Sequence, residues 1–100
     1  MIRRTVTVTL ENGLHMMPAS EIAKSVQGFR GRVVLRRDQI VADAHSMLDL
    51  LQLKAEYGTT LEVEADGDGA DSIVDAIARL FAMNFAVERP AAPGAGASDK

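Results

Sequence analysis

The junction at Gly13 is the feature that most constrains the fold, because the periodicity of the sequence changes there. Before it, apolar residues alternate with threonines over residues 5–10, which is typical of a half-buried strand. After it, apolar residues recur at helical spacing over residues 19–26. Pro18 suits the first turn of a helix, since it lacks only an N–H that would have no partner there. The sequence therefore predicts a strand followed directly by a helix.

His15 lies between these two segments, just outside the first helical turn. The unpaired amides and the positive dipole end of a helix N-terminus favour an anion, and a neutral imidazole is a competent nucleophile near pH 7. His15 is therefore a candidate phosphoryl acceptor, and the backbone amides of Met16 and Met17 are candidate hydrogen-bond donors to the phosphate. The alternative is a surface loop histidine without a chemical role.

The same patterns predict three more strands and a long C-terminal helix. Short apolar runs bounded by turn residues predict strands over residues 32–36, 40–42 and 60–65. The third helix opens at Asp71. Its apolar residues follow at helical spacing and are Ile73, Val74, Ile77, Leu80, Phe81 and Phe85.

A further helix between the second and third of these strands has signals at both ends. Ser46, with Asp49 three residues later, forms a capping-box pattern, and Tyr57-Gly58 is the expected stop. The element order is then βαββαβα. This order predicts an α+β fold in which one sheet has a single apolar face covered by helices.

The order strand, Gly-Leu-His, Pro-Ala, helix resembles the histidine-containing phosphocarrier protein (HPr) family of the bacterial phosphoenolpyruvate-dependent phosphotransferase system. Five of the seven residues in Gly13–Ala19 match the family's Gly-Leu-His-Ala-Arg-Pro-Ala. A second family motif, a serine that opens a short apolar helix, is present at Ser46–Leu53. The similarity spans residues 2–85. It implies an HPr-like open-faced sandwich with a four-stranded antiparallel sheet covered on one face by three helices.

The resemblance implies that His15 accepts a phosphoryl group from enzyme I and passes it to an enzyme IIA in a sugar transport system, without a cofactor. The protein would be a phosphoryl carrier rather than an independent enzyme. The family's active-site arginine is Met17 here. A hydrogen bond to a charged group contributes about 1.5–3 kcal/mol, so its loss could weaken transfer roughly ten- to hundredfold. The alternative is an HPr-like regulatory or binding module with weak or no phosphoryl transfer.

The resemblance also implies a partner surface around His15. Methionine packs adaptably, which suits a surface that docks enzyme I and enzyme IIA in turn. The competing interpretation is that the apolar residues of the second helix fill the core. The implied contact residues are Met16, Met17, Ser20, Lys24, Met47, Leu48 and Leu51.

Ser46 has two interpretations. As a helix N-cap it would contribute about 0.5–2 kcal/mol, which is sufficient to explain it. The resemblance adds a regulatory role, since a serine kinase phosphorylates some family members at this position. Asp43 and Asp49 would oppose the added charge. For His45 we expect a role in packing or local polarity and none in catalysis.

The composition bounds the domain organisation. One hundred residues with 47% hydrophobic content are sufficient for one domain. From residue 87 the chain is rich in Pro, Gly and Ala, which cannot bury enough surface to offset the entropy of ordering. We therefore expect an HPr-like domain over residues 1–86 and a disordered tail over residues 87–100.

Charge and motifs limit the partners. A net charge of −3 and a pI near 5.2 give no attraction for nucleic acid or an anionic membrane. The lack of cysteine excludes disulfides and thiolate metal sites. Residues 1–4 enter the strand pattern without an apolar signal region, so we expect a soluble, cytoplasmic protein, and the resemblance implies a monomer. A soft-metal site remains a further alternative, with candidate ligands His15, His45, Met16, Met17 and Met47.

Overall fold

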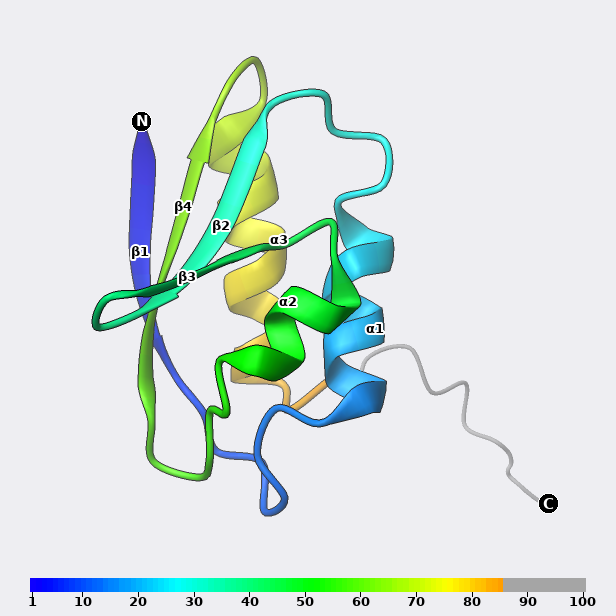
Figure 1. Cartoon of the computed structure of the whole chain (residues 1–100). Coiled ribbons are helices and arrows are strands. Elements are labelled where there is room, and N and C mark those ends of the chain that lie inside the picture. Colours follow the sequence, from blue (N-terminus) through cyan, green and yellow to red (C-terminus); the bar gives the residue numbers. More distant parts are fainter. Residues whose placement is uncertain (86–100) are drawn as a thin grey trace, which may run out of the picture.

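The structure, a computed structural model, describes residues 1–85 as a four-stranded sheet with three helices on one face (Figure 1). The expected α+β open-faced sandwich and the order βαββαβα are confirmed. The proposed boundary at residue 86 and the tail over residues 87–100 lie outside the described residues. The elements are β1 (Ile2–Thr7), α1 (Met16–Ser25), β2 (Arg32–Arg37), β3 (Ile40–Asp43), α2 (Met47–Gln52), β4 (Thr60–Asp66) and α3 (Ala70–Ala82).

The sheet has the order β1-β4-β2-β3, and every neighbouring pair is antiparallel. Alternation along the strands sends Val33, Leu35 and Val63 to the helix-covered face. On the open face, Arg36 binds the carboxylate of Glu64 through two hydrogen bonds of 3.1 and 3.2 Å. This bonding holds the pKa of the Glu64 carboxyl below its usual value. One face of the sheet is therefore apolar core, and the other carries ion pairs.

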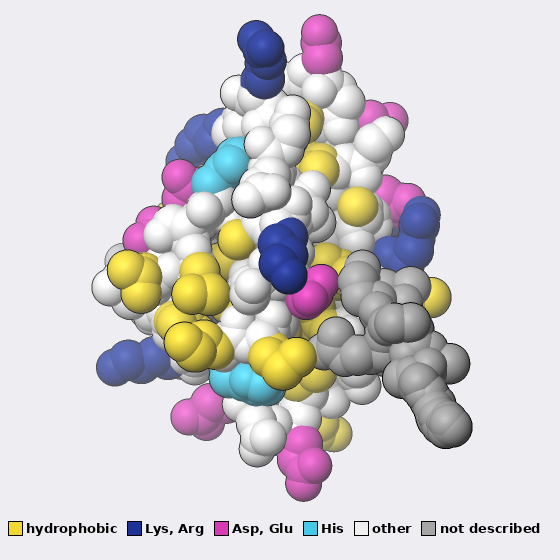
Figure 2. All heavy atoms as spheres, turned by 90° about the vertical axis from the view of Figure 1, so that its right-hand side faces the viewer, with side chains coloured by type: hydrophobic (Ala, Val, Ile, Leu, Met, Phe, Trp, Pro, Cys, Tyr) yellow, Lys and Arg dark blue, Asp and Glu magenta, His cyan; other side chains and the backbone are white. Residues whose placement is uncertain are grey.

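The helices close the core in one layer. α3 packs across β1 and β4, and α1 contacts both α2 and α3. Ile22, Leu50 and Ile77 contribute one fully buried side chain from each helix. Burying a side chain of this kind stabilises the fold by about 1.5–3 kcal/mol relative to exposure. α1 and α2 contact each other, and the two histidines that precede them are both visible on one face of the molecule (Figure 2).

The first strand has different bounds from the predicted ones, but the same side chains point into the core. β1 runs from Ile2 to Thr7, earlier than the predicted residues 5–10. Val8 still exchanges two backbone hydrogen bonds with the start of β4, of 2.8 Å to Thr59 and 2.7 Å from Gly58. Val8 is fully buried, so the apolar face is as predicted. The helical spacing also suggested Phe85, yet α3 ends at Ala82.

The predicted end of the second helix is wrong. α2 ends at Gln52 instead of continuing to Tyr57-Gly58, and Lys54 adopts a left-handed conformation with φ of 51°. The reversal turns Ala55 inward, where its carbonyl accepts a 2.8 Å hydrogen bond from the amide of Leu14. A long-range contact thus sets this boundary, whereas local sequence signals do not. The boundaries of β2, β3, β4 and the start of α3 lie within one residue of prediction.

Candidate functional site

Gly13 sets the backbone that leads into α1. Its φ is 72°, and a Cβ atom there would lie 2.6 Å from the carbonyl oxygen of Ala55 and 3.0 Å from the Cα of Glu56. Both the conformation and the space therefore require glycine. The next residue, Leu14, is buried in the core and bonded to Ala55. These contacts hold the residue that follows, His15, at a defined place.

His15 is the backbone N-cap of α1. Its carbonyl accepts a 3.0 Å bond from the amide of Ala19, and its own amide donates a 3.0 Å bond to the carbonyl of Gly13. The imidazole is exposed and makes no capping hydrogen bond. Within residues 1–85, no side-chain hydrogen bond of any kind occupies the ring. Its nitrogens are thus accessible to an incoming group.

Two backbone amides beside His15 are also free. Met16 and Met17 are the first two residues of α1, where amides have no intrahelical carbonyl to bind. Pro18 has no N–H, and Ala19 already bonds to His15. Among the described residues neither methionine amide has another acceptor. The amides of Met16 and Met17 therefore remain the candidate donors to an anion, as the sequence predicts.

Cationic side chains are scarce at this end of α1. The position of the family's arginine holds Met17, whose side chain is 54% exposed. The basic residue of the helix, Lys24, lies in its last turn. Seven residues along a helix span about 10 Å, so Lys24 is far from the first turn. The helix start thus offers amides and dipole to an anion, but no side-chain charge from α1 itself.

The start of α2 is built differently. The hydroxyl oxygen of Ser46 accepts a 3.2 Å bond from the amide of Asp49, which confirms its N-cap role. The reciprocal half of the predicted capping box is absent, because the Asp49 carboxylate accepts from the amide of Asp43 at 3.3 Å. Two carboxylates therefore lie near Ser46. Regulatory phosphorylation of Ser46 stays a prediction.

His45 is tied to its surroundings. Its Nδ1 lies 3.1 Å from Oδ1 of Asp43, and its Nε2 lies 3.3 Å from the carbonyl oxygen of Phe29. The His45 amide donates a 2.9 Å bond to the same Asp43 oxygen. That bond is the main cause that lowers the pKa of the Asp43 carboxyl. His45 thus links the loop before α2 to the loop after α1, which agrees with the expected local polar role.

The implied contact residues lie on α1 and α2, which pack against each other. Figure 2 shows hydrophobic side chains gathered between the two histidines on one face of the molecule. Met16, Met17 and Leu48 are 60%, 54% and 69% exposed. Met47 and Leu51 are half-buried against the core, Ser20 is half-buried, and Lys24 is exposed. The core interpretation therefore holds in part for Met47 and Leu51 but not for Leu48.

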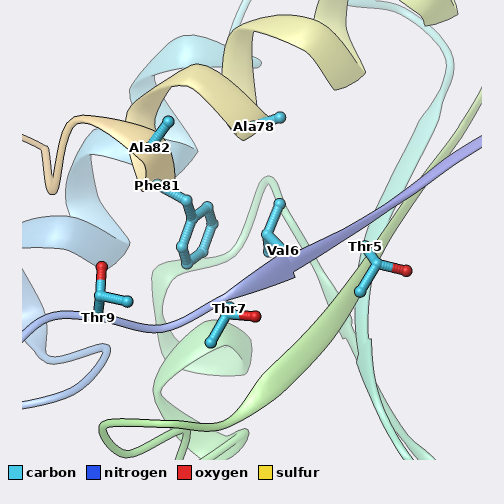
Figure 3. A pocket seen from close by; sticks show the side chains of 7 residues that line it. All are labelled: Thr5, Val6, Thr7, Thr9, Ala78, Phe81 and Ala82. Atoms are coloured by element: carbon cyan, nitrogen blue, oxygen red, sulfur yellow. The ribbon is translucent and has the colours of Figure 1, made fainter.

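Three further features of the described residues bear on other kinds of site. Within residues 1–85 no group of three His, Cys, Asp or Glu side chains is placed to hold a metal ion, and the two histidines lie on opposite sides of the hydrophobic group (Figure 2). An open hollow of about 360 Å³ lies between β1 and α3 (Figure 3). None of the predicted site residues lines it. No helix in the described part of the chain is long and apolar enough to cross a bilayer.

The segment after α2 is the part of the site that the sequence does not predict. Ala55 and Glu56 pack against Gly13, and Ala55 bonds to Leu14, about 40 residues earlier in the chain. The signal that could have located this contact is a glycine in the left-handed position, but Lys54 holds that position. Gly58, which does carry such a signal, instead shapes the turn into β4 with φ of 91°.

Comparisons with known proteins point to one family. A family model described as PTS HPr component phosphorylation site matches residues 2–83. The chain is 35% identical over 85 residues to the phosphocarrier protein NPr of Escherichia coli (strain K12), covering 84% of this chain and 94% of that protein. It is 32% identical over 88 residues to the phosphocarrier protein HPr of Treponema pallidum (strain Nichols), covering 88% and 100%. It also matches 20% of the phosphoryl donor subunit DhaM of the PEP-dependent dihydroxyacetone kinase of Klebsiella michiganensis, at 33% identity over 92 residues and 90% of this chain.

Solved structures share the fold. HPr from Thermoanaerobacter tengcongensis superposes with a TM-score of 0.81 at 22% identity, covering 85% of this chain and 96% of that one. A histidine-containing phosphocarrier protein from Mycoplasma gives a TM-score of 0.77 at 25% identity, with coverage of 85% and 96%. The family model spans nearly all of the described residues, and the curated relatives match over almost their whole length. The chain therefore belongs to the HPr family of phosphocarrier proteins of the phosphotransferase system.

Proposed function

We propose that His15 accepts a phosphoryl group from a protein of the enzyme I type and passes it to one of the enzyme IIA type. In the first step a bond forms between a nitrogen of the His15 ring and phosphorus, while the donor's bond to phosphorus breaks. In the second step the nitrogen–phosphorus bond breaks as the acceptor bonds to phosphorus. The observation that carries this proposal is the free imidazole beside the free amides of Met16 and Met17.

The physical basis of transfer is positioning and charge stabilisation. A phosphoryl group in transfer carries its charge on peripheral oxygens, and preoriented donors stabilise that charge without reorganising. The amides of Met16 and Met17 and the dipole of α1 supply such donors. The similarity to the subunit DhaM, a phosphoryl donor of a PEP-dependent kinase, supports phosphoenolpyruvate as the original source. A relay of this kind would operate in the cytoplasm.

The exposed apolar group around His15 is the proposed docking surface for both partners. Met16, Met17 and Leu48 expose more than half of their side chains. Flexible methionines can repack against different surfaces, which suits a carrier with more than one partner. The half-buried Met47, Leu51 and Ser20 and the exposed Lys24 would complete the contact.

Leu48→Asp should slow transfer from enzyme I while leaving the fold unchanged.

The decisive experiment is intact mass measured under alkaline conditions, because phosphohistidine is acid-labile. Wild type, His15→Ala and His45→Gln are incubated with phosphoenolpyruvate and an extract of the source cells. We expect one added phosphoryl group in wild type and His45→Gln and none in His15→Ala. Phosphorylation of His15→Ala would contradict the site. No added group in an extract with a demonstrated phosphorelay would support the binding module instead.

Met17→Arg sharpens this result. An arginine at Met17 adds a charged donor to the first turn of α1, where the structure has none. We expect the phosphorylated fraction at equilibrium to rise up to tenfold in ratio to the free form. An unchanged ratio would show that a cation at position 17 does not stabilise the phosphorylated form.

A further inference from the structure

Arg36 and Arg37 are already bound to other groups, and Lys24 lies far from the start of α1. Arg36 is bound to Glu64, and Arg37 donates a 2.8 Å bond to the carbonyl of Leu53. Lys24 lies in the last turn of α1. Lys54 lies in the segment just after α2. Its side chain is exposed and, among residues 1–85, has neither an ion pair nor a hydrogen bond.

The backbone brings the segment that follows α2 to the loop before α1. Figure 1 shows the loop before α1 and the segment after α2 meeting at the lower end of the molecule. The two segments run in opposite directions, since Val8 bonds to Thr59 and, further along, Leu14 bonds to Ala55. Extending this alignment by one residue places Lys54 level with His15. The contact at Gly13 holds the alignment, because the backbone of Ala55 and Glu56 is packed against it.

The conformation of Lys54 is unusual for a residue with a side chain. Its φ of 51° lies in the left-handed region, where glycine is the ordinary choice at a helix end. The turn itself would form more easily with glycine. A lysine in this position places a flexible, four-carbon chain and a compact charge at the tip of the reversal. This arrangement adds a charge, which the turn does not require, to the segment that meets the loop before α1.

We propose that the ammonium group of Lys54 binds the phosphoryl oxygens on His15 and replaces the arginine that is absent at Met17. This role rests on the phosphoryl transfer proposed above. Lysine binds phosphate as a point charge, and three ammonium protons can approach the oxygens from several directions. Here the cation comes from the segment after α2, whereas the family's arginine belongs to the first helical turn. The amides of Met16 and Met17 would bind the phosphoryl group from the side of α1.

The test uses chemical phosphorylation, so that it does not depend on any partner protein. Phosphoramidate phosphorylates histidine directly, and a His45→Gln background leaves His15 as the acceptor. Phosphorus NMR then follows the last ionisation of the phosphoryl group with pH. We compare the parent with Lys54→Gln, Lys54→Gly and Lys54→Arg, and use Lys24→Gln as the matched exposed cation. Lys54→Gly also relieves the left-handed conformation, which separates loss of charge from loss of fold.

A nearby cation favours the dianion and lowers the pKa of the phosphoryl group. Lys54→Gln and Lys54→Gly should move the titration midpoint to higher pH, so that the ratio of dianion to monoanion at the parent's midpoint falls about threefold. Lys54→Arg and Lys24→Gln should titrate like the parent, and 1 M salt should abolish the difference. The proposal is overturned if both charge-removing variants titrate like the parent, or if Lys24→Gln shifts the midpoint equally. Failure of enzymatic transfer alone would contradict the proposed function and leave this result standing.

Discussion

The starts of α1 and α2 lie on one face of the molecule, and a histidine lies at or next to each. The two starts differ in whether their amides and their histidine rings have hydrogen-bond partners. At α2 the Ser46 hydroxyl binds the helix amide of Asp49, and the His45 ring is held by Asp43 and Phe29. At α1 the His15 ring is unbound, and Met16 and Met17 keep free amides. A filled helix start contributes stability, whereas an open one retains donors for an anion. The difference separates a structural histidine from a candidate reactive one.

The largest expected effect on stability comes from disturbing Gly13, which sets the backbone before α1. Gly13→Ala forces a side chain into a left-handed conformation and toward the carbonyl of Ala55. We expect a loss of about 2–3 kcal/mol in the free energy of unfolding, measured by urea denaturation. Gly28→Ala is the control, since a Cβ there meets no atom within 4 Å. Equal midpoints for the two variants would show that the loop before α1 is not held as described.

The two caps themselves should differ. Ser46→Ala removes the hydroxyl that binds the Asp49 amide and should cost about 1 kcal/mol. His15→Ala removes a side chain without a capping bond and should change stability by less than about 0.5 kcal/mol. Thermal unfolding followed by circular dichroism distinguishes these values. A larger loss at His15 would mean that its ring is bound after all.

Filling the open start should stabilise the protein. His15→Asp gives α1 an acceptor for the free amide of Met17 and a negative charge at the positive end of the dipole. We expect a gain of about 0.5–1 kcal/mol in thermal unfolding, with loss of phosphorylation. Ser46→Asp is the matched control and should gain little, because that helix is already capped. Similar gains at both positions would remove the contrast between the two starts.

The smallest expected effect is on the loss of stability at acidic pH. The His45 amide bond lowers the pKa of Asp43, and a carboxyl with a lowered folded pKa adds stability above its unfolded pKa. That contribution is lost as the pH falls below about 4 toward the folded pKa. Asp43→Asn should therefore weaken the acid dependence of the melting temperature between pH 7 and 3, although only modestly because the side chain is 56% exposed. Asp68→Asn should retain the wild-type profile, and identical profiles for both variants would contradict the role of the bond.

Local periodicity is sufficient to predict most of the helices and strands and the start of α1. It does not predict the segment after α2 that packs against the loop before α1. Alternation and helical spacing predict the elements because one face of each must be buried, as Val8 and Ile22 are. Pro18 and the Gly13-Leu14-His15 motif likewise predict the start of α1. The sequence alone does not reveal that Ala55 bonds to Leu14, because this contact joins distant segments. The end of α2 is missed for the same reason: tertiary packing holds Lys54 where local propensity favours glycine.

The open start of α1 would also limit how many partner proteins can bind at once. Phosphate would arrive at His15 and leave from His15, next to the exposed apolar side chains of Met16 and Met17. Donor and acceptor proteins must then cover the same patch, so neither can be seated while the other is. Each turnover would consist of two separate encounters, and an excess of the unphosphorylated donor would act as a competitive inhibitor of delivery. The protein would therefore bind only one partner at a time.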